Sequence, residues 1–264
     1  MSDPLIIIPA RLGATRLPNK PLADIHGEPM IVRVWRRVTE ANAGAVYVAT
    51  DAPEIADVVR RAGGEAVMTG AHHESGSDRV CEAANIVDPQ GAVQIVVNVQ
   101  GDMPTLQPDV VAAALDPLSD PAVDIATVAS PITEPSECLD PAVVKIVPSA
   151  FSRPGVFRAI YFSRGGAPYG PGAYYHHIGI YAFRRAALHR FVNLPVSALE
   201  RRERLEQLRA LEAGMRIDVR LVESTPFGVD VPADLERARA ILAPARRDLE
   251  EGLAMGVAIG AAIS

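Results

Sequence analysis

Short apolar runs alternate with segments of helical spacing along the first half of the chain, and this alternation limits the possible folds more than any other feature. The runs lack the polar alternation of a half-exposed sheet, so they are typical of strands buried on both faces. They are Leu5–Pro9, Ala45–Thr50, Val93–Val99 and Asp124–Ser130. The helical segments are Met30–Asn42, Pro53–Arg61, Asp78–Asn85 and Gln107–Leu115. We therefore predict an α/β fold with a mostly parallel, Rossmann-like sheet and helices on both faces.

The character of the sequence changes after Pro131, where Pro, Gly and aromatic residues become frequent. We predict a small β-rich lobe over about 131–183, built on the parallel sheet. A single amphipathic helix over Ala198–Ala213, a strand at Ile217–Val222 and a helix from about Ala233 complete the predicted core. We expect a single domain over 1–247, followed by an apolar tail at 248–264.

Composition excludes several classes of protein. Among 264 residues, 26 Lys and Arg face 32 Asp and Glu, and the net charge of −6 argues against a general affinity for nucleic acid. The 2 cysteines have no CxxC spacing, which disfavours a disulfide framework or a zinc site. No apolar stretch approaches the roughly 20 residues that span a bilayer, and no signal-peptide pattern is visible. We expect a cytoplasmic, soluble protein.

The loop after the first predicted strand carries three cations, Arg11, Arg16 and Lys20, with no carboxylate between them. Ligands of open α/β sheets bind at the carboxyl ends of strands, and guanidinium groups suit phosphate oxygens. The loop therefore indicates an anionic ligand, although a solvated basic loop would show the same pattern. Neither GxxxxGK[ST] nor GxGxxG is present here, so an ATPase or dinucleotide cradle is not supported.

The same loop, IPARLGATRLPNKPL, resembles the N-terminal signature of the 3-deoxy-manno-octulosonate (KDO) cytidylyltransferases. Further matching motifs follow in order: GEPMI at Gly27–Ile31, VATD at Val48–Asp51, HESGSDR at His73–Arg79, VNVQGDMP at Val97–Pro104, YFSR at Tyr161–Arg164, HIGIYAFR at His177–Arg184, LEQLR at Leu205–Arg209 and GVDVPADLE at Gly228–Glu236. The resemblance implies a nucleotidyltransferase fold and CMP transfer from CTP to the anomeric hydroxyl of KDO, with release of pyrophosphate. The product would serve lipopolysaccharide or capsule synthesis.

The resemblance also implies a set of nucleotide-binding and metal-binding residues. Those that would contact CTP are Arg11, Arg16, Lys20, Ser75, Gly76, Arg79 and Gln100, with Arg11, Lys20 and Asp102 as catalytic residues. Asp102 and Asp230 stand at strand ends, where they would hold Mg²⁺ together with substrate phosphates. A turn or a helix start would equally account for either aspartate, and Ser75 or Ser77 could cap a helix that begins near Asp78.

The later motifs imply a sugar site. Arg164 would pair with the sugar carboxylate. The residues that match family positions for the sugar hydroxyls are Gln100, His177, Tyr181, Glu206 and Gln207. Without a sugar-binding role, Glu206 and Gln207 would lie on a solvated helix face, and His177 would form a surface pair with His176.

The chain departs from the family pattern at a few places. Asn19 replaces the usual Gly of the first loop, and Asn tolerates positive φ. Met103 stands where Glu is usual, and Gly165–Gly172 replaces a longer segment of the sugar rim and dimer contact. We expect a homodimer that binds CTP and a KDO-like sugar acid. Two alternatives stay open: a cytidylyltransferase for a related ulosonic acid such as amino-KDO, and a catalytically weak nucleotide-binding paralogue.

Overall fold

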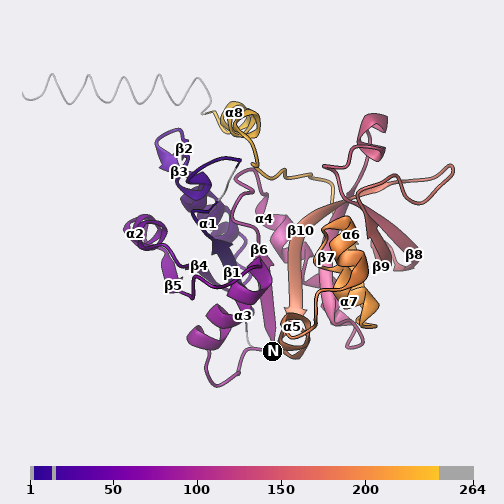
Figure 1. Cartoon of the computed structure of the whole chain (residues 1–264), viewed down its shortest axis with the longest axis horizontal. Helices are drawn as coiled ribbons and strands as arrows, with labels where there is room; N and C mark the ends of the chain where they lie inside the picture. Colours follow the sequence, from indigo (N-terminus) through magenta and orange to yellow (C-terminus); the bar gives the residue numbers. More distant parts are fainter. Residues whose placement is uncertain (1–2, 14–15, 244–264) are drawn as a thin grey trace, which may run out of the picture.

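A nine-stranded sheet runs through the whole molecule in the order β5-β4-β1-β6-β10-β7-β11-β9-β8 (Figure 1). The computed structural model describes residues 3–13 and 16–243, so the predicted tail at 248–264 lies outside the described residues. The strands of the sheet are β1 (Leu5–Ala10), β4 (Ala45–Thr50), β5 (Glu65–Met68), β6 (Ile95–Val99), β7 (Ile125–Pro131), β8 (Lys145–Arg153), β9 (Val156–Ser163), β10 (Tyr175–Arg184) and β11 (Ile217–Leu221). A separate hairpin comprises β2 (Asp24–Ile25) and β3 (Glu28–Pro29).

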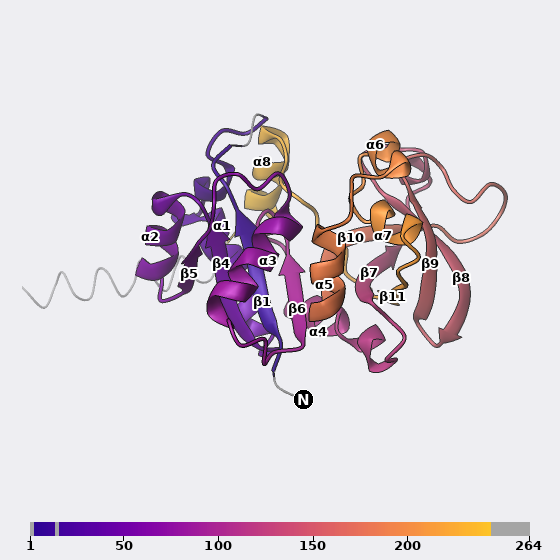
Figure 2. The same ribbon diagram turned by 60° about the horizontal axis from the view of Figure 1, so that its bottom comes forward.

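Helices cover both faces of this sheet, which explains why its first strands are apolar without alternation. The helices are α1 (Met30–Glu40), α2 (Pro53–Arg61), α3 (Gly76–Val87), α4 (Pro108–Ala113), α5 (Arg185–Val192), α6 (Ala198–Glu203), α7 (Leu208–Glu212) and α8 (Pro232–Ile241). Within β1, Leu5 and Ile7 pack in the core under α3 and α5, whereas Ile6 and Ile8 pack under α1, α2 and α4 (Figure 2). Burying both faces of the strands is the main source of stability.

Strand directions confirm the predicted mostly parallel sheet. β5, β4, β1 and β6 run parallel, and β7 and β11 are parallel to each other. β10 runs antiparallel to both β6 and β7 and so joins the two parallel groups. The α/β class, the helices on both faces and the β-rich lobe of the prediction are confirmed.

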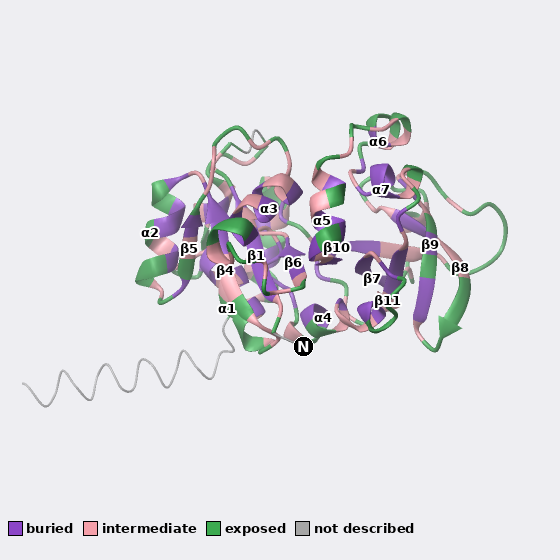
Figure 3. Cartoon of the chain, turned by 90° about the horizontal axis from the view of Figure 1, so that it is seen from below, coloured by how far each residue is buried: buried purple, intermediate pink, exposed green. Residues whose placement is uncertain are grey.

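The β-rich lobe is closed by β8, which pairs with two strands. This strand pairs with β9 and also returns to β10, so β10, β7, β11, β9 and β8 close into a ring. Phe157 and Phe162 are fully buried in the core that this ring shares with α7, and the C-terminal end of β8, residues 150–153, is exposed (Figure 3). The predicted domain limits, 1–247 with a lobe at about 131–183, stay predictions.

The single helix predicted over Ala198–Ala213 is wrong. α6 ends at Glu203, because Arg204 adopts a left-handed conformation with φ of 55°. The N–H groups of Arg204 and Leu205 both donate to the Glu200 carbonyl, which closes the helix end around the left-handed residue. Leucine spacing continues across this break because Leu205 is buried in the same core as the leucines that follow it. No helix in the described part of the chain is long and apolar enough to cross a membrane.

Candidate active site

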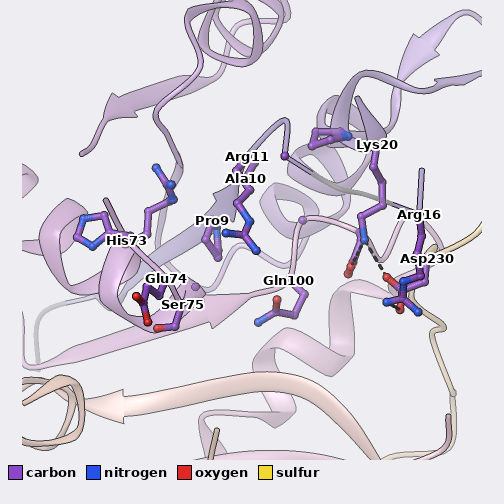
Figure 4. Close-up of a pocket in the computed structure, with 16 residues that line it drawn as sticks. Pro9, Ala10, Arg11, Arg16, Lys20, His73, Glu74, Ser75, Gln100 and Asp230 are labelled. Carbon is purple, nitrogen blue, oxygen red and sulfur yellow. Dashed lines mark hydrogen bonds and ion pairs between the residues drawn. The ribbon is translucent and has the colours of Figure 1, made fainter. Parts of the chain in front are cut away.

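A cavity of about 360 Å³ opens at the carboxyl ends of β1 and β6, beside the start of α3 (Figure 4). Nine of the residues predicted for CTP or metal line it: Arg11, Arg16, Lys20, Ser75, Gly76, Arg79, Gln100, Asp102 and Asp230. Parallel pairing of β1 with β6 brings the first loop and the loop after β6 to one edge of the sheet. A Cβ on Gly101 would lie 3.0 Å from the carbonyl oxygen of Pro9, so glycine permits this close approach.

Two cations of the first loop, Arg16 and Lys20, contact two aspartates. The Lys20 ammonium lies 2.7 Å from Asp102 and 3.1 Å from Asp230, and Arg16 pairs with Asp230 at 3.0 Å. Burial alone would lower the pKa of Lys20, but the two carboxylates outweigh it and raise that pKa. Asn19 has φ of 54°, as expected of a residue that tolerates the left-handed region, and immediately precedes the turn that carries Lys20. Because its pKa is raised, the Lys20 ammonium stays charged near neutral pH.

Asp102 and Asp230 come together although 128 residues separate them, and a backbone hydrogen bond accounts for their proximity. The Val229 N–H donates to the Asp102 carbonyl over 2.9 Å. Asp234, in the first turn of α8, accepts hydrogen bonds from the N–H groups of Asp230 and Val231 at 2.9 and 3.0 Å. The loop before α8 is thus held against the loop after β6.

The pair of aspartates fits a divalent cation that completes its coordination with phosphate oxygens. Both offer carboxylate oxygens within reach of one point, which the Lys20 ammonium contacts. Three or more potential ligands do not cluster anywhere among residues 3–13 and 16–243. Mg²⁺ needs no such cluster, because it commonly binds through one or two carboxylates, substrate phosphates and water.

The opposite wall of the cavity is the N-terminus of α3. Ser75 caps this helix, since its side-chain oxygen accepts a hydrogen bond from the N–H of Asp78 at 3.1 Å. The capping role that the sequence left open is therefore real, and it leaves N–H groups at the helix start facing the cavity. Arg79 is buried, with its guanidinium donating to the Thr69 hydroxyl at 2.6 Å and lying 3.4 Å from Asp51.

The break between α6 and α7 carries Glu206 and Gln207 toward α3. The Ser77 hydroxyl donates to Glu206 over 3.0 Å, which joins the predicted sugar residues to α3, whose N-terminus lines the cavity. Burial raises the pKa of Glu206. One side-chain atom of each residue, Glu206 Oε1 and Gln207 Nε2, is buried with no hydrogen-bond partner within the described ranges. A solvated helix face does not describe them, and such atoms are available to a polar ligand.

β10 supplies two further predicted sugar residues, His177 and Tyr181. His177 lies in the core, where its Nε2 is 3.1 Å from the Thr127 hydroxyl, and burial lowers its pKa to about 3. Burial, together with Glu206, raises the pKa of Tyr181 well above its usual value. The register of β10 against β7 shifts between Ile178 and Tyr181. Gln100 approaches this bulge, 3.3 Å from where a Cβ on Gly179 would be, and so lies between the cavity and β10.

Arg164 does not line the cavity. It follows β9 directly, and its Nε and Nη1 atoms each donate over 2.9 Å, to the carbonyl oxygens of Glu203 and Pro141 respectively. Pairing of β8 with both β9 and β10 places this end of β9 near the start of β10, where His177 lies. Arg164 and His177 are therefore on the same side of the lobe.

Sequence reasoning missed functional contacts made by Asp51 and Ser77. Asp51 ends the VATD motif immediately after β4 and pairs with Arg79, so its place at a strand end was the available signal. Ser77 was considered only as a helix cap, whereas its hydroxyl binds Glu206. That contact depends on a residue 129 positions away, and no local pattern indicates it.

Comparisons with known proteins agree with this geometry. The cytidylyltransferase family model matches residues 5–217. A relative from Methylobacterium radiotolerans, named 3-deoxy-manno-octulosonate cytidylyltransferase, is 63% identical over 92% of this chain and 98% of its own length. A relative of the same name from Azorhizobium caulinodans is 62% identical over 92% of this chain and 96% of its own length.

A solved structure extends the similarity to three dimensions. It is described as CMP:2-keto-3-deoxy-manno-octonic acid synthetase complexed with CTP, and it superposes with a TM-score of 0.84 at 41% identity. The similarity covers 92% of this chain and 99% of that one. The resemblance carried by the sequence motifs is thereby confirmed, and the chain belongs to the 3-deoxy-manno-octulosonate cytidylyltransferase family.

Proposed function

We propose that this chain transfers CMP from CTP to the anomeric hydroxyl of KDO and releases pyrophosphate. The observation that carries the proposal is the joining of two sets of residues. Arg11, Arg16 and Lys20 surround a cavity of nucleotide size, and the Ser77–Glu206 hydrogen bond attaches a second, polar wall to it. Family membership supports the same reaction.

In this reaction the anomeric oxygen forms a bond to the α-phosphorus of CTP and its hydroxyl proton passes to solvent. The bond between the α-phosphorus and the oxygen that bridges it to the β-phosphorus breaks, and pyrophosphate leaves with that oxygen. The protein's task is to position two anionic substrates and to offset their charge. We assign the triphosphate to Arg11, Arg16 and Lys20, and the nucleoside side of CTP to Ser75, Gly76, Arg79 and Gln100. Bidentate guanidinium contacts would orient the phosphates, and the α3 N-terminus would add N–H donors.

A divalent cation, which we propose is Mg²⁺, would be held by Asp102 and Asp230 and would neutralise charge on the phosphate oxygens. The contact of Lys20 with both aspartates keeps the site from presenting two unpaired carboxylates to the incoming triphosphate. We assign the sugar acid to Arg164 for its carboxylate, and to Gln100, His177, Tyr181, Glu206 and Gln207 for its hydroxyls.

Pyrophosphate release by the purified protein with CTP, KDO and Mg²⁺ tests the proposal. Turnover is expected with this combination, and replacing CTP by UTP or ATP should lower it by about tenfold or more, because a base pocket rejects a wrong hydrogen-bonding pattern. Intact CTP binding without turnover on any sugar acid would overturn the proposal in favour of a nucleotide-binding paralogue. Faster turnover with an amino-KDO substrate would redirect it to that related ulosonic acid.

The setting of the enzyme belongs to the same proposal. We propose that it acts in the cytoplasm, that its product serves lipopolysaccharide or capsule synthesis, and that it works as a homodimer. The β-rich lobe supports a dimer, because it exposes large apolar side chains. These are Leu139, Phe151, Ile160 and Tyr169, with exposed fractions of 77%, 46%, 58% and 103%.

A further inference from the structure

Arg164 is held by uncharged acceptors on its side chain, and this leaves its charge available to a ligand. Its Nε donates to the Glu203 carbonyl and its Nη1 to the Pro141 carbonyl. A carbonyl oxygen orients a guanidinium group without neutralising it, whereas a carboxylate would do both. The arrangement suits an arginine that must wait for an anionic partner.

A single carboxylate fixes the main chain that carries this arginine. Glu203 Oε2 accepts the backbone N–H of Arg164 at 2.9 Å, while Oε1 lies 3.2 Å from the Ser163 hydroxyl and 3.3 Å from the Tyr161 hydroxyl. The same residue's carbonyl binds the Arg164 side chain. Glu203 therefore contacts Arg164 at two points and holds the end of β9 from a distance of 39 positions in sequence.

The carbonyl oxygen of Arg164 is held by a buried cation. Lys145 is fully buried, and its ammonium donates to the carbonyl oxygens of Arg164, Asp140 and Val143 at 2.7, 2.8 and 2.6 Å. An ammonium group has three protons, and each has an acceptor here. The N–H and the C=O of Arg164 are thus both fixed by charged side chains of opposite sign.

We propose that Glu203 is a positioning residue for the sugar acid, acting through Arg164. Glu203 is the last residue of α6, three positions before Glu206, so one short segment holds Arg164 and also supplies a predicted sugar ligand. Its carboxylate therefore sets the spacing between the carboxylate-binding and hydroxyl-binding sides of the sugar site. The inference rests on the proposed function, because it concerns the sugar acid of that reaction.

Kinetics of Glu203→Ala test the proposal. The KM for KDO should rise about tenfold, because about 1.4 kcal/mol of positioning hydrogen bonds is lost, while the KM for CTP stays within about twofold. Glu203→Gln should recover most of the loss: its amide oxygen can accept the Arg164 N–H and its amide nitrogen can donate to the two hydroxyls. Equal changes in both KM values, or no change in either, would overturn the proposal.

A double-mutant cycle separates action through Arg164 from a general effect on the fold. In an Arg164→Ala background, Glu203→Ala should raise the KM for KDO by less than about twofold more; a full additional tenfold rise would show that Glu203 does not act through Arg164. The matched control is Glu212→Ala, because Glu212 is also a glutamate that accepts a backbone N–H, that of Leu199 at 3.2 Å, but it joins α7 to α6 and not α6 to β9. This control should leave the KM for KDO unchanged.

Hydrogen exchange at the Arg164 amide tests whether Glu203 positions Arg164, and it does not depend on turnover. Protection in the parent and its loss in Glu203→Ala, but not in Glu212→Ala, is expected because the Arg164 N–H donates to Glu203. Unchanged protection in Glu203→Ala would contradict the proposal. A parent that fails to use KDO would instead remove the proposed function, and the exchange measurement would still show whether Glu203 positions Arg164.

Discussion

Lys20 lies between Asp102 and Asp230, 2.7 and 3.1 Å from their oxygens, and this contact sets the charge of the cavity floor. Its side chain is only 15% exposed, whereas Asp230 is 49% exposed. The partly buried Lys20–Asp102 pair is therefore the stronger contact, and the Arg16–Asp230 pair at the surface contributes little to stability.

Asp102→Asn tests the role of this carboxylate. Turnover should fall by at least about 100-fold, because the amide has no charge to hold a divalent cation. The free energy of unfolding should change by less than about 1 kcal/mol, because the amide oxygen still accepts from Lys20. Pyrophosphate release and urea denaturation measure the two effects. Asp57→Asn, on the exposed face of α2, is the control, and parent-like turnover in Asp102→Asn would remove Asp102 from the mechanism.

His177 gives the molecule a stability that depends on pH. Its pKa is about 3 in the folded chain because it is buried, against about 6.5 for the ordinary imidazole. Between about pH 3 and 6.5 the unfolded chain binds more protons than the folded chain. The free energy of unfolding therefore rises with pH, and this contribution to stability is lost as the pH falls. Urea denaturation at pH 7 and pH 5 should show a smaller loss for His177→Gln than for the parent. Equal losses in His177→Gln and in the parent would contradict this assignment.

The break between α6 and α7 positions two residues of the proposed site. It turns Glu206 and Gln207 away from a continuous helix and lets Glu206 reach Ser77 on α3. The left-handed Arg204 produces the turn, and the buried Leu205 anchors it. The residues that contact substrate in our proposal thus depend on one unusual backbone conformation.

Substitutions at Arg204 distinguish this break from a continuous helix. Arg204→Gly should be more stable than Arg204→Ala by about 1 kcal/mol, because glycine adopts the left-handed region without strain. A continuous helix would reverse the order, since alanine exceeds glycine by about 1 kcal/mol in a helix interior. Urea denaturation of the two variants decides the sign. The KM for KDO should be the same in both, because Arg204 is exposed.

How far sequence predicts this protein depends on the range of the contacts involved. β1, β4 and β6 are predictable because burial on both faces leaves a continuous apolar run. The first loop predicts an anion site for a reason that is also local in sequence, because its three cations lie close together with no carboxylate between them. The break in the predicted helix over 198–213 and the contacts of the Glu203 carboxylate were not predictable. One depends on a single backbone angle at Arg204, and the other on hydroxyl and N–H groups about forty positions away.

At the scale of the whole molecule, β10 connects the two halves of the site. Its antiparallel pairing with β6 places it beside the strand that leads into Gln100 and Asp102. Its pairing with β7 and β8 makes it part of the closed ring that carries His177 and Tyr181. Both parts of the proposed site therefore share one continuous hydrogen-bonded sheet.

The mass of the protein in solution tests the dimer. Light scattering should give twice the 28.1 kDa of one chain, and Ile160→Arg should reduce the mass to that of a monomer, because a charge would enter an apolar contact. The control is Met68→Arg, at an exposed position on β5, the opposite edge of the sheet. CTP binding should be unchanged in both variants. A monomeric parent would rule out the dimer.

The central place of β10 also has a consequence for the order in which the chain can fold during synthesis. β6 and β7 are complete at positions 99 and 131, but the strand that lies between them spans Tyr175–Arg184. Until that segment leaves the ribosome, each of these apolar strands has an open edge where β10 belongs, and open edges invite pairing with other chains. The halves of the sheet close only late, so this enzyme is most exposed to aggregation while it is a nascent chain ending before Tyr175.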